Sequence, residues 1–118
     1  MRAVILLVEE DRLTRITICD MLMALDYRVF GVNSVARARR VMHALAIDAM
    51  IVTTKPSVSI EPAYAAEAKA LQPNIKVVLV SPNAALQYLV PSVDAFVLKP
   101  FLLETLGNTL IAVLQKLH

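Results

Sequence analysis

Several short apolar runs of this sequence end directly in residues that could take part in chemistry. Adjacent carboxylates follow the first run, and such groups repel one another unless a metal ion or an ammonium group lies nearby. Hydroxyls follow two later runs, and a lysine follows the last one. Any function of the chain depends on whether the fold brings these side chains together. In chain order they are Glu9, Glu10, Thr53, Thr54, Ser81 and Lys99.

Unbroken apolar runs of this length are typical of strands that are covered on both faces of a parallel sheet. The clearest is Asp48–Thr54, where four apolar residues stand between a charge and two hydroxyls. Patterns of helical period separate the runs, and this alternation predicts a doubly wound α/β domain. Such sheets hold their functional groups beyond the carboxyl ends of the strands. The five predicted strands are Ala3–Val8, Tyr27–Val32 (an edge strand), Asp48–Thr54, Ile75–Val80 and Asp94–Leu98.

Capping residues and prolines indicate where the predicted helices begin and end. Asp11 suits the N-cap of the first helix, and Asp26 suits a left-handed turn after it. Either Asn33 or Ser34 caps the second helix. The first helix runs to about Leu25, the third opens at Pro62, the fourth lies between Pro82 and Pro91, and the last carries an apolar stripe from Leu103 to Leu117.

Composition excludes several classes of protein. A chain of 118 residues is long enough for a core of its own, and we expect residues 1–118 to form one domain. The longest apolar run, Ala3–Val8, is too short to cross a bilayer, and no signal peptide is evident. A net charge of +2 does not indicate nucleic-acid binding. The single cysteine, Cys19, cannot form an internal disulfide, so a cytoplasmic location fits best.

With the strand ends assembled, the chain resembles the receiver domains of the response-regulator family, which work in two-component (phosphorelay) signalling. The order of five strands and five helices covers the whole length. The resemblance is carried by VILLVEED at the first strand, VLVS at the fourth and DAFVLKPF at the fifth. It implies a CheY-like, flavodoxin-like (βα)5 sandwich of three layers, with a parallel five-stranded sheet in the order 2-1-3-4-5.

The resemblance also implies roles for individual residues. In the family, an aspartate at the end of the third strand accepts a phosphoryl group beside a magnesium ion. Here Glu9 and Glu10 match the acidic pair that holds magnesium, Ser81 the hydroxyl that bonds a phosphoryl oxygen, Lys99 the lysine that pairs with the acyl phosphate, and Phe96 the aromatic switch. The peptide bond between Lys99 and Pro100 should be cis.

The phospho-acceptor position departs from the family pattern. Counting along the third strand places Thr53 there, or Thr54 if the loop is one residue out. A threonine hydroxyl is neutral at pH 7 and no base is evident beside it, so attack on a phosphohistidine is not expected. Mg²⁺ would lose a ligand, so we expect weak magnesium binding at most and no other cofactor. Without an aspartate, the Lys99 ammonium should turn to Glu9 or Glu10.

Two hypotheses from different classes remain open. The first is a pseudo-receiver, a signalling module that binds protein partners without phosphorylation on aspartate. The second is a flavodoxin-like domain that binds a small ligand at the same strand ends. Only two glycines exist, Gly31 and Gly107, and neither lies in a loop of the phosphate-cradling type. An enzyme is not expected, because the candidate residues form no nucleophile–base pair recognisable from spacing.

A partner surface is expected on the face formed by the fourth helix, the fifth strand and the fifth helix, which carries output in the family. Apolar residues in excess of a core's needs usually mark interfaces. We expect either self-association or a constitutive protein partner there, and neither nucleic acid nor membrane. The alternative, that these residues close the core of a monomer, stays open. The candidate interface residues are Leu86, Tyr88, Leu89, Val90, Leu102 and Ile111.

Overall fold

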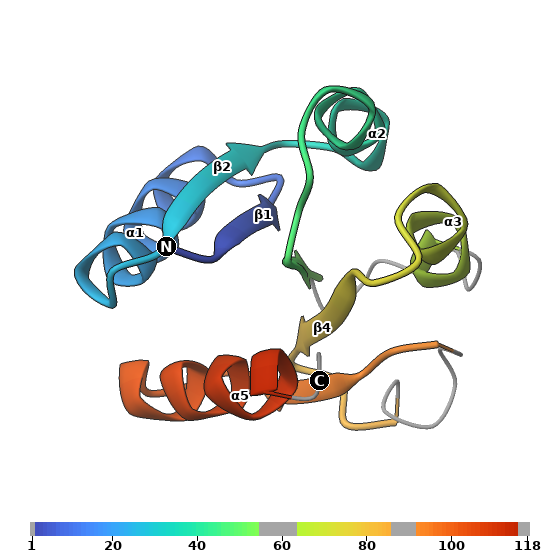
Figure 1. Cartoon of the computed structure of the whole chain (residues 1–118). Helices are drawn as coiled ribbons and strands as arrows, with labels where there is room; N and C mark the ends of the chain where they lie inside the picture. Colours follow the sequence, from blue (N-terminus) through green and yellow to red (C-terminus); the bar gives the residue numbers. More distant parts are fainter. Residues whose placement is uncertain (1, 55–63, 86–91, 116–118) are drawn as a thin grey trace.

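The computed structural model describes residues 2–54, 64–85 and 92–115. Five parallel strands form one sheet in the order β2-β1-β3-β4-β5, as the resemblance implied. β3 lies at its centre and β2 is an edge strand, as predicted (Figure 1). The strands are β1 (Val4–Val8), β2 (Arg28–Val32), β3 (Ala49–Thr53), β4 (Lys76–Ser81) and β5 (Ala95–Leu98).

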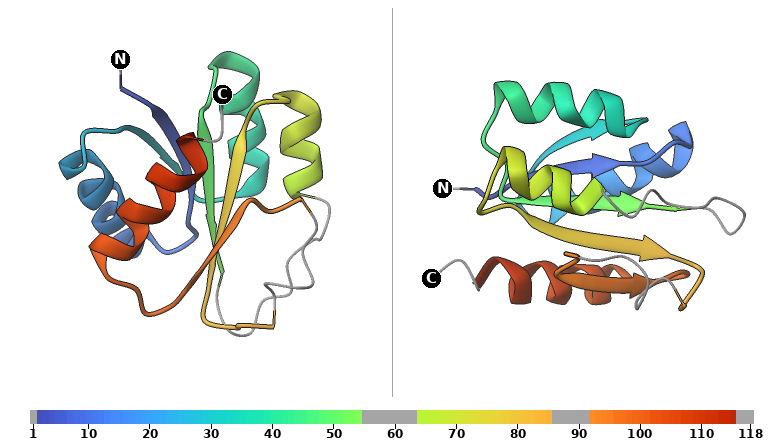
Figure 2. Two further views of the ribbon diagram at one scale, coloured as in Figure 1. Left: turned by 60° about the horizontal axis from the view of Figure 1, so that its bottom comes forward. Right: turned by 90° about the vertical axis from the view of Figure 1, so that its right-hand side faces the viewer.

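Helices cover both faces of the sheet, so the fold is the predicted doubly wound α/β sandwich (Figure 2). α2 (Val35–Ala44) and α3 (Tyr64–Leu71) bury their apolar residues against one face. α1 (Arg12–Ala24) and α5 (Leu103–Gln115) do so against the other. The expected start of the third helix at Pro62 and most of the expected fourth helix lie outside the described residues.

Successive strand residues face opposite sides of a sheet, and two separate cores result. Leu6, Val8 and Val52 pack in the core under α2 and α3. Leu7 and Ile51 pack in the core under α1 and α5. This alternation also decides which side chains at the strand ends can meet.

The expected capping residues lie at the helix ends. Asp11 is the N-cap of α1, and its side chain accepts a hydrogen bond from the Thr14 backbone N–H. Ser34 rather than Asn33 caps α2. Asp26 has a φ of 69°, the left-handed conformation expected at the turn into β2.

Carboxylates tie neighbouring strands together at the amino-terminal edge of the sheet. Asp48 accepts a hydrogen bond from the Val4 backbone N–H at 2.7 Å. Asp94 accepts from the Val77 backbone N–H and from Lys69 Nζ, each at 2.7 Å. Both acids therefore support the sheet and lie at the edge opposite to the candidate residues.

Candidate functional site

The register of the sheet places Glu9 and Thr53 side by side. Val8 of β1 pairs with Val52 of β3, and Glu9 and Thr53 are the residues that follow them, so the two lie on adjacent strands at the same level. Both follow residues of the α2–α3 core, so alternation directs both toward the α1–α5 face. Lys99 lies two residues beyond Val97, which packs in the α1–α5 core, and so it follows the same face.

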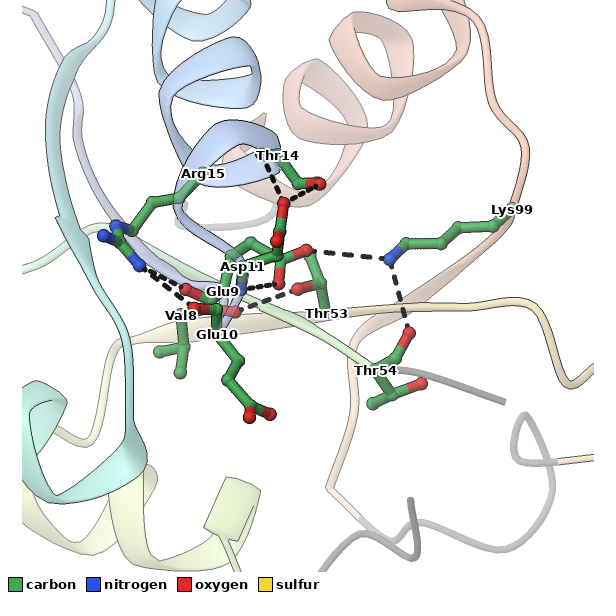
Figure 3. Close-up of polar contacts among 9 residues, drawn as sticks. All are labelled: Val8, Glu9, Glu10, Asp11, Thr14, Arg15, Thr53, Thr54 and Lys99. Carbon is green, nitrogen blue, oxygen red and sulfur yellow. Dashed lines mark hydrogen bonds and ion pairs between the residues drawn. The ribbon is translucent and has the colours of Figure 1, made fainter. Parts of the chain in front are cut away.

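Glu9 is the buried acid of this site, with a side chain only 5% exposed. One carboxylate oxygen, Oε1, lies 3.7 Å from Lys99 Nζ. The other, Oε2, accepts a hydrogen bond from the Asp11 backbone N–H at 2.9 Å. The Glu9 carboxylate thus joins the first helix to the fifth strand (Figure 3).

Lys99 reaches across the carboxyl edge of the sheet from the end of β5. Its backbone N–H bonds to the Ser81 carbonyl at 2.9 Å, which extends the β4–β5 ladder by one residue. Its ammonium donates to the Thr54 carbonyl at 3.3 Å in addition to the ion pair with Glu9. The Lys99–Pro100 peptide bond is cis, as the resemblance implied.

Thr53 closes β3 between these two charges. Its hydroxyl donates to the Val8 carbonyl at 3.2 Å, so its proton is held by the neighbouring strand (Figure 3). Thr54 is buried, and its Oγ1 has no hydrogen-bond partner among the described residues. Because Thr54 is one residue further on, alternation directs its side chain to the opposite face from Glu9 and Lys99. The geometry therefore favours Thr53 over Thr54 as the counterpart of the phospho-acceptor.

Of the two residues matched to the acidic pair, Glu10 does not lie beside Lys99, so the structure does not bring the expected pair of carboxylates together. The Glu10 side chain is exposed and points away from Glu9 and Lys99 (Figure 3). The backbone of this turn is held by Arg15, whose Nη1 donates to the Glu9 carbonyl at 2.9 Å and to the Glu10 carbonyl at 3.4 Å. One carboxylate, rather than two, therefore enters the ion pair with Lys99.

Ser81 and Phe96 belong to the opposite side of the sheet. Ser81 is fully buried, and its Oγ accepts a hydrogen bond from the Asn83 backbone N–H at 3.0 Å within its own loop. Phe96 packs against the core under α2 and α3. In this structure no hydrogen bond joins either described side chain to Glu9, Thr53 or Lys99.

Arg15 is a site residue that sequence reasoning missed. Its stem packs against β2, where a Cβ on Gly31 would lie 3.2 Å from Arg15 Cγ and 2.8 Å from Cys19 Sγ. The glycine thus lets α1 approach the sheet closely enough for the guanidinium to reach the turn after β1. Burial raises the pKa of the Cys19 thiol, although the Arg15 charge opposes this, so the thiol behaves as a small packing residue. The position of Arg15 on the first turns of α1, a few residues after Glu9 and Glu10, was the signal by which the sequence could have indicated this role.

The donor set does not fit a magnesium ion. Mg²⁺ requires near-octahedral oxygen ligands about 2.0–2.1 Å away, usually including one or two carboxylates. Glu9 Oε2 accepts from the Asp11 backbone N–H and Oε1 lies 3.7 Å from the Lys99 ammonium, Glu10 points away, and Thr53 supplies a neutral hydroxyl that is bonded to a carbonyl. Over residues 2–54, 64–85 and 92–115, no group of three or more His, Cys, Asp or Glu side chains could hold a metal ion. That magnesium binds weakly at most stays a prediction.

Comparison with known proteins gives a fold but no sequence family. No family model matches the chain, and no curated protein sequence matches it. Many solved structures are similar. A receiver domain of an HD-domain protein from Pseudomonas fluorescens superposes with a TM-score of 0.86 at 18% identity, covering 100% of this chain and 98% of that one.

Two further structures have the same architecture. A response regulator receiver protein from Sinorhizobium medicae has a TM-score of 0.85 at 22% identity, covering 99% and 98% of the two chains. The response regulator TrrA from Thermotoga maritima, solved with Mg²⁺ and BeF, has a TM-score of 0.82 at 18% identity, covering 94% and 98%. The chain therefore has the CheY-like fold of response regulator receiver domains. In the described part of the chain, no helix is long and apolar enough to cross a membrane.

Proposed function

We propose that this chain is a pseudo-receiver of two-component signalling, a cytoplasmic module that acts through protein partners without being phosphorylated on aspartate. The observation that carries the proposal is Thr53. It ends β3 beside Glu9 and Lys99, where the resemblance requires an aspartate, and its hydroxyl donates to the Val8 carbonyl. The receiver fold supports the signalling role, and this substitution supports independence from phosphorylation.

The chemistry of phosphoryl transfer to a receiver needs an anionic oxygen and a metal ion at the same place. Thr53 offers a neutral hydroxyl that is bonded to the Val8 carbonyl, and Glu9, the acid at the adjacent strand end, is paired with Lys99. The structurally similar response regulator TrrA from Thermotoga maritima was solved in complex with Mg²⁺ and BeF. Here the ammonium of Lys99 lies 3.7 Å from the carboxylate of the buried Glu9 and opposes its charge. For the same reasons we propose that the chain is not an enzyme.

Incubation of the purified protein with a small phosphodonor and Mg²⁺ should leave its intact mass unchanged. Thr53 has no carboxylate to form an acyl phosphate, and the Glu9 carboxylate is held by Lys99 and the Asp11 backbone N–H. Mass spectrometry of the intact chain measures this directly, with a phosphorylatable receiver treated in parallel as the positive control. A stoichiometric gain of one base-labile phosphate would refute the proposal.

The partner surface is proposed on the side of β5 and α5. In the described part of this face, Leu102 is 71% exposed and Ile111 is 50% exposed, and Leu98 on β5 is 49% exposed. Exposed apolar side chains gathered on one side of a domain favour an interface. The other candidate interface residues, Leu86, Tyr88, Leu89 and Val90, lie outside the described residues.

Self-association through this face should be lost when charge is placed on it. We expect Leu102→Glu and Ile111→Glu to shift the sedimentation coefficient toward that of a monomer, because burying an unpaired carboxylate in an interface is costly. Leu45→Glu is the matched control, since Leu45 is 40% exposed but lies after α2, on the other side of the sheet. Analytical ultracentrifugation over a range of concentrations measures the effect. A wild-type protein that is monomeric throughout, and that loses no protein partner in the variants, would end this part of the proposal.

A further inference from the structure

A cavity of about 540 Å³, broadly open to solvent, lies on the α1–α5 face of the sheet beside Lys99. Its first wall is α1, which contributes Leu13, Ile18 and Met21. The facing wall comes from the two loops after β4 and β5, which contribute Pro82, Pro100 and Phe101. The cavity is within the range of roughly 300–1,000 Å³ that is usual for sites of small molecules. It also lies at the carboxyl edge of the strands, where open α/β sheets bind ligands.

The lining is apolar except for one cation. Two threonines, Thr14 and Thr17, also line the cavity, but their hydroxyl protons are already donated. Thr14 Oγ1 donates to Asp11 Oδ2 at 2.7 Å, and Thr17 Oγ1 donates to the Leu13 carbonyl at 2.9 Å. Among the described lining residues, Lys99 is therefore the charged group, and it is a cation.

The Lys99 ammonium has capacity for a further acceptor. An ammonium group has three N–H donors. One donates to the Thr54 carbonyl, and the Glu9 carboxylate lies at 3.7 Å, beyond the usual length of a hydrogen bond. The Lys99 side chain is 24% exposed, so an acceptor can reach it from the cavity. A carboxylate is the acceptor that gains most here, because charge-assisted hydrogen bonds are stronger than neutral ones.

We propose that this cavity binds a small hydrophobic carboxylate, with its apolar body between α1 and the loops after β4 and β5 and its carboxylate on Lys99. A phosphorylated cofactor fits less well, because neither Gly31 nor Gly107 lies in a loop beside the cavity and the described lining holds one cation. A sugar or other polar ligand would leave its hydroxyls without partners against the apolar walls.

Calorimetric titration with a matched series of ligands tests the chemistry of the head group. Octanoate, 1-octanol and octylamine have the same chain and differ in charge. We expect octanoate to bind at least tenfold more tightly than octanol, and octylamine to bind more weakly still, because it would place a second cation against Lys99. Absence of octanoate binding, or equal affinities for octanoate and octanol, would overturn the proposal.

Two variants locate the site. Thr17→Trp should fill the cavity from an exposed position on α1 and weaken octanoate binding at least tenfold. The matched control is Thr109→Trp, because Thr109 makes the same hydroxyl bond to a carbonyl four residues earlier, but on α5 and away from the cavity lining.

Lys99→Met keeps the stem of the side chain and should remove the preference for octanoate over octanol. If this variant is unfolded, Thr17→Trp and the series of head groups still test the proposal, because neither experiment removes the ion pair between Glu9 and Lys99. Octanoate binding that survives Thr17→Trp unchanged would place the ligand elsewhere and refute the site.

Discussion

Replacing Thr53 by aspartate should convert a site that is inert to phosphodonors into one that binds Mg²⁺ and gains one phosphoryl group. The new carboxylate would stand beside Glu9 and near Lys99, with the Val8 carbonyl where the Thr53 hydroxyl now donates. Close negative groups disfavour the charged forms unless a cation binds, so the variant should be less stable than wild type without metal. Mg²⁺ should restore the stability by mass action, by about 2.7 kcal/mol at a metal concentration one hundred times the Kd.

Thermal unfolding across a Mg²⁺ titration, followed by intact-mass analysis with a phosphodonor, measures both effects. Thr53→Asn is the control of matched shape, and it should show neither the magnesium effect nor the mass gain. Thr54→Asp tests the alternative position, and it should also fail, since alternation directs residue 54 away from Lys99. If Thr53→Asp folds but stays inert, the site lacks more than one carboxylate. Phosphorylation of Thr54→Asp instead would move the assignment by one residue.

Removing the charge of Lys99 should produce the largest loss of stability outside the apolar cores. Breaking a buried ion pair by removing one partner leaves a buried charge uncompensated, at a cost of about 3–5 kcal/mol. The Lys99 side chain is 24% exposed and the separation is 3.7 Å, so we expect the lower end, about 3 kcal/mol, for Lys99→Met. For a domain of this size that corresponds to a Tm lower by roughly 10 °C.

An exposed ion pair of the same chain provides the control. Arg2 lies 3.0 Å from Asp26, with side chains 62% and 79% exposed, so Arg2→Met should change the free energy of unfolding by less than about 1 kcal/mol. Combining Lys99→Met with Glu9→Gln should recover part of the loss, because the amide oxygen can still accept from the Asp11 backbone N–H. Chemical denaturation of the four proteins separates the two pairs. Equal changes in the free energy of unfolding for Lys99→Met and Arg2→Met would show that the Glu9–Lys99 pair is solvated and does not stabilise the fold.

The architecture could be predicted because its signals are local and repeated. Each unbroken apolar run became a strand of the parallel sheet, and Asp11, Asp26 and Ser34 took the capping or turn positions that their side chains favour. The bounds shifted by one or two residues, as when the strand predicted over Asp48–Thr54 became Ala49–Thr53. Asp48 lies just before the strand, where its carboxylate accepts a hydrogen bond from the Val4 backbone N–H.

The site was harder to predict because it depends on side-chain direction across four strands. Adjacent Glu9 and Glu10 look equivalent in sequence, yet only one can point to the α1–α5 face. The register pairs Thr53 with Val80, so the next residues, Thr54 and Ser81, face the same side of the sheet. That side is opposite to Lys99, so the Ser81 hydroxyl does not reach it. The position of Arg15 depends on the close approach of α1 to β2 that Gly31 permits, and no sequence motif indicates that approach.

Amide NMR spectra of the wild-type protein, recorded with and without Mg²⁺ and beryllofluoride, test the central claim most directly. Beryllofluoride with Mg²⁺ mimics a phosphoryl group at a receiver's aspartate. Because Thr53 supplies no carboxylate and Glu9 is paired with Lys99, we expect neither Mg²⁺ nor beryllofluoride to bind. The spectra with and without them should therefore superimpose, including the amides at the ends of β1, β3 and β5. Saturable shifts at Glu9, Thr53 and Lys99 at submillimolar Mg²⁺ would contradict the account and show that the site still works as a phosphoryl switch.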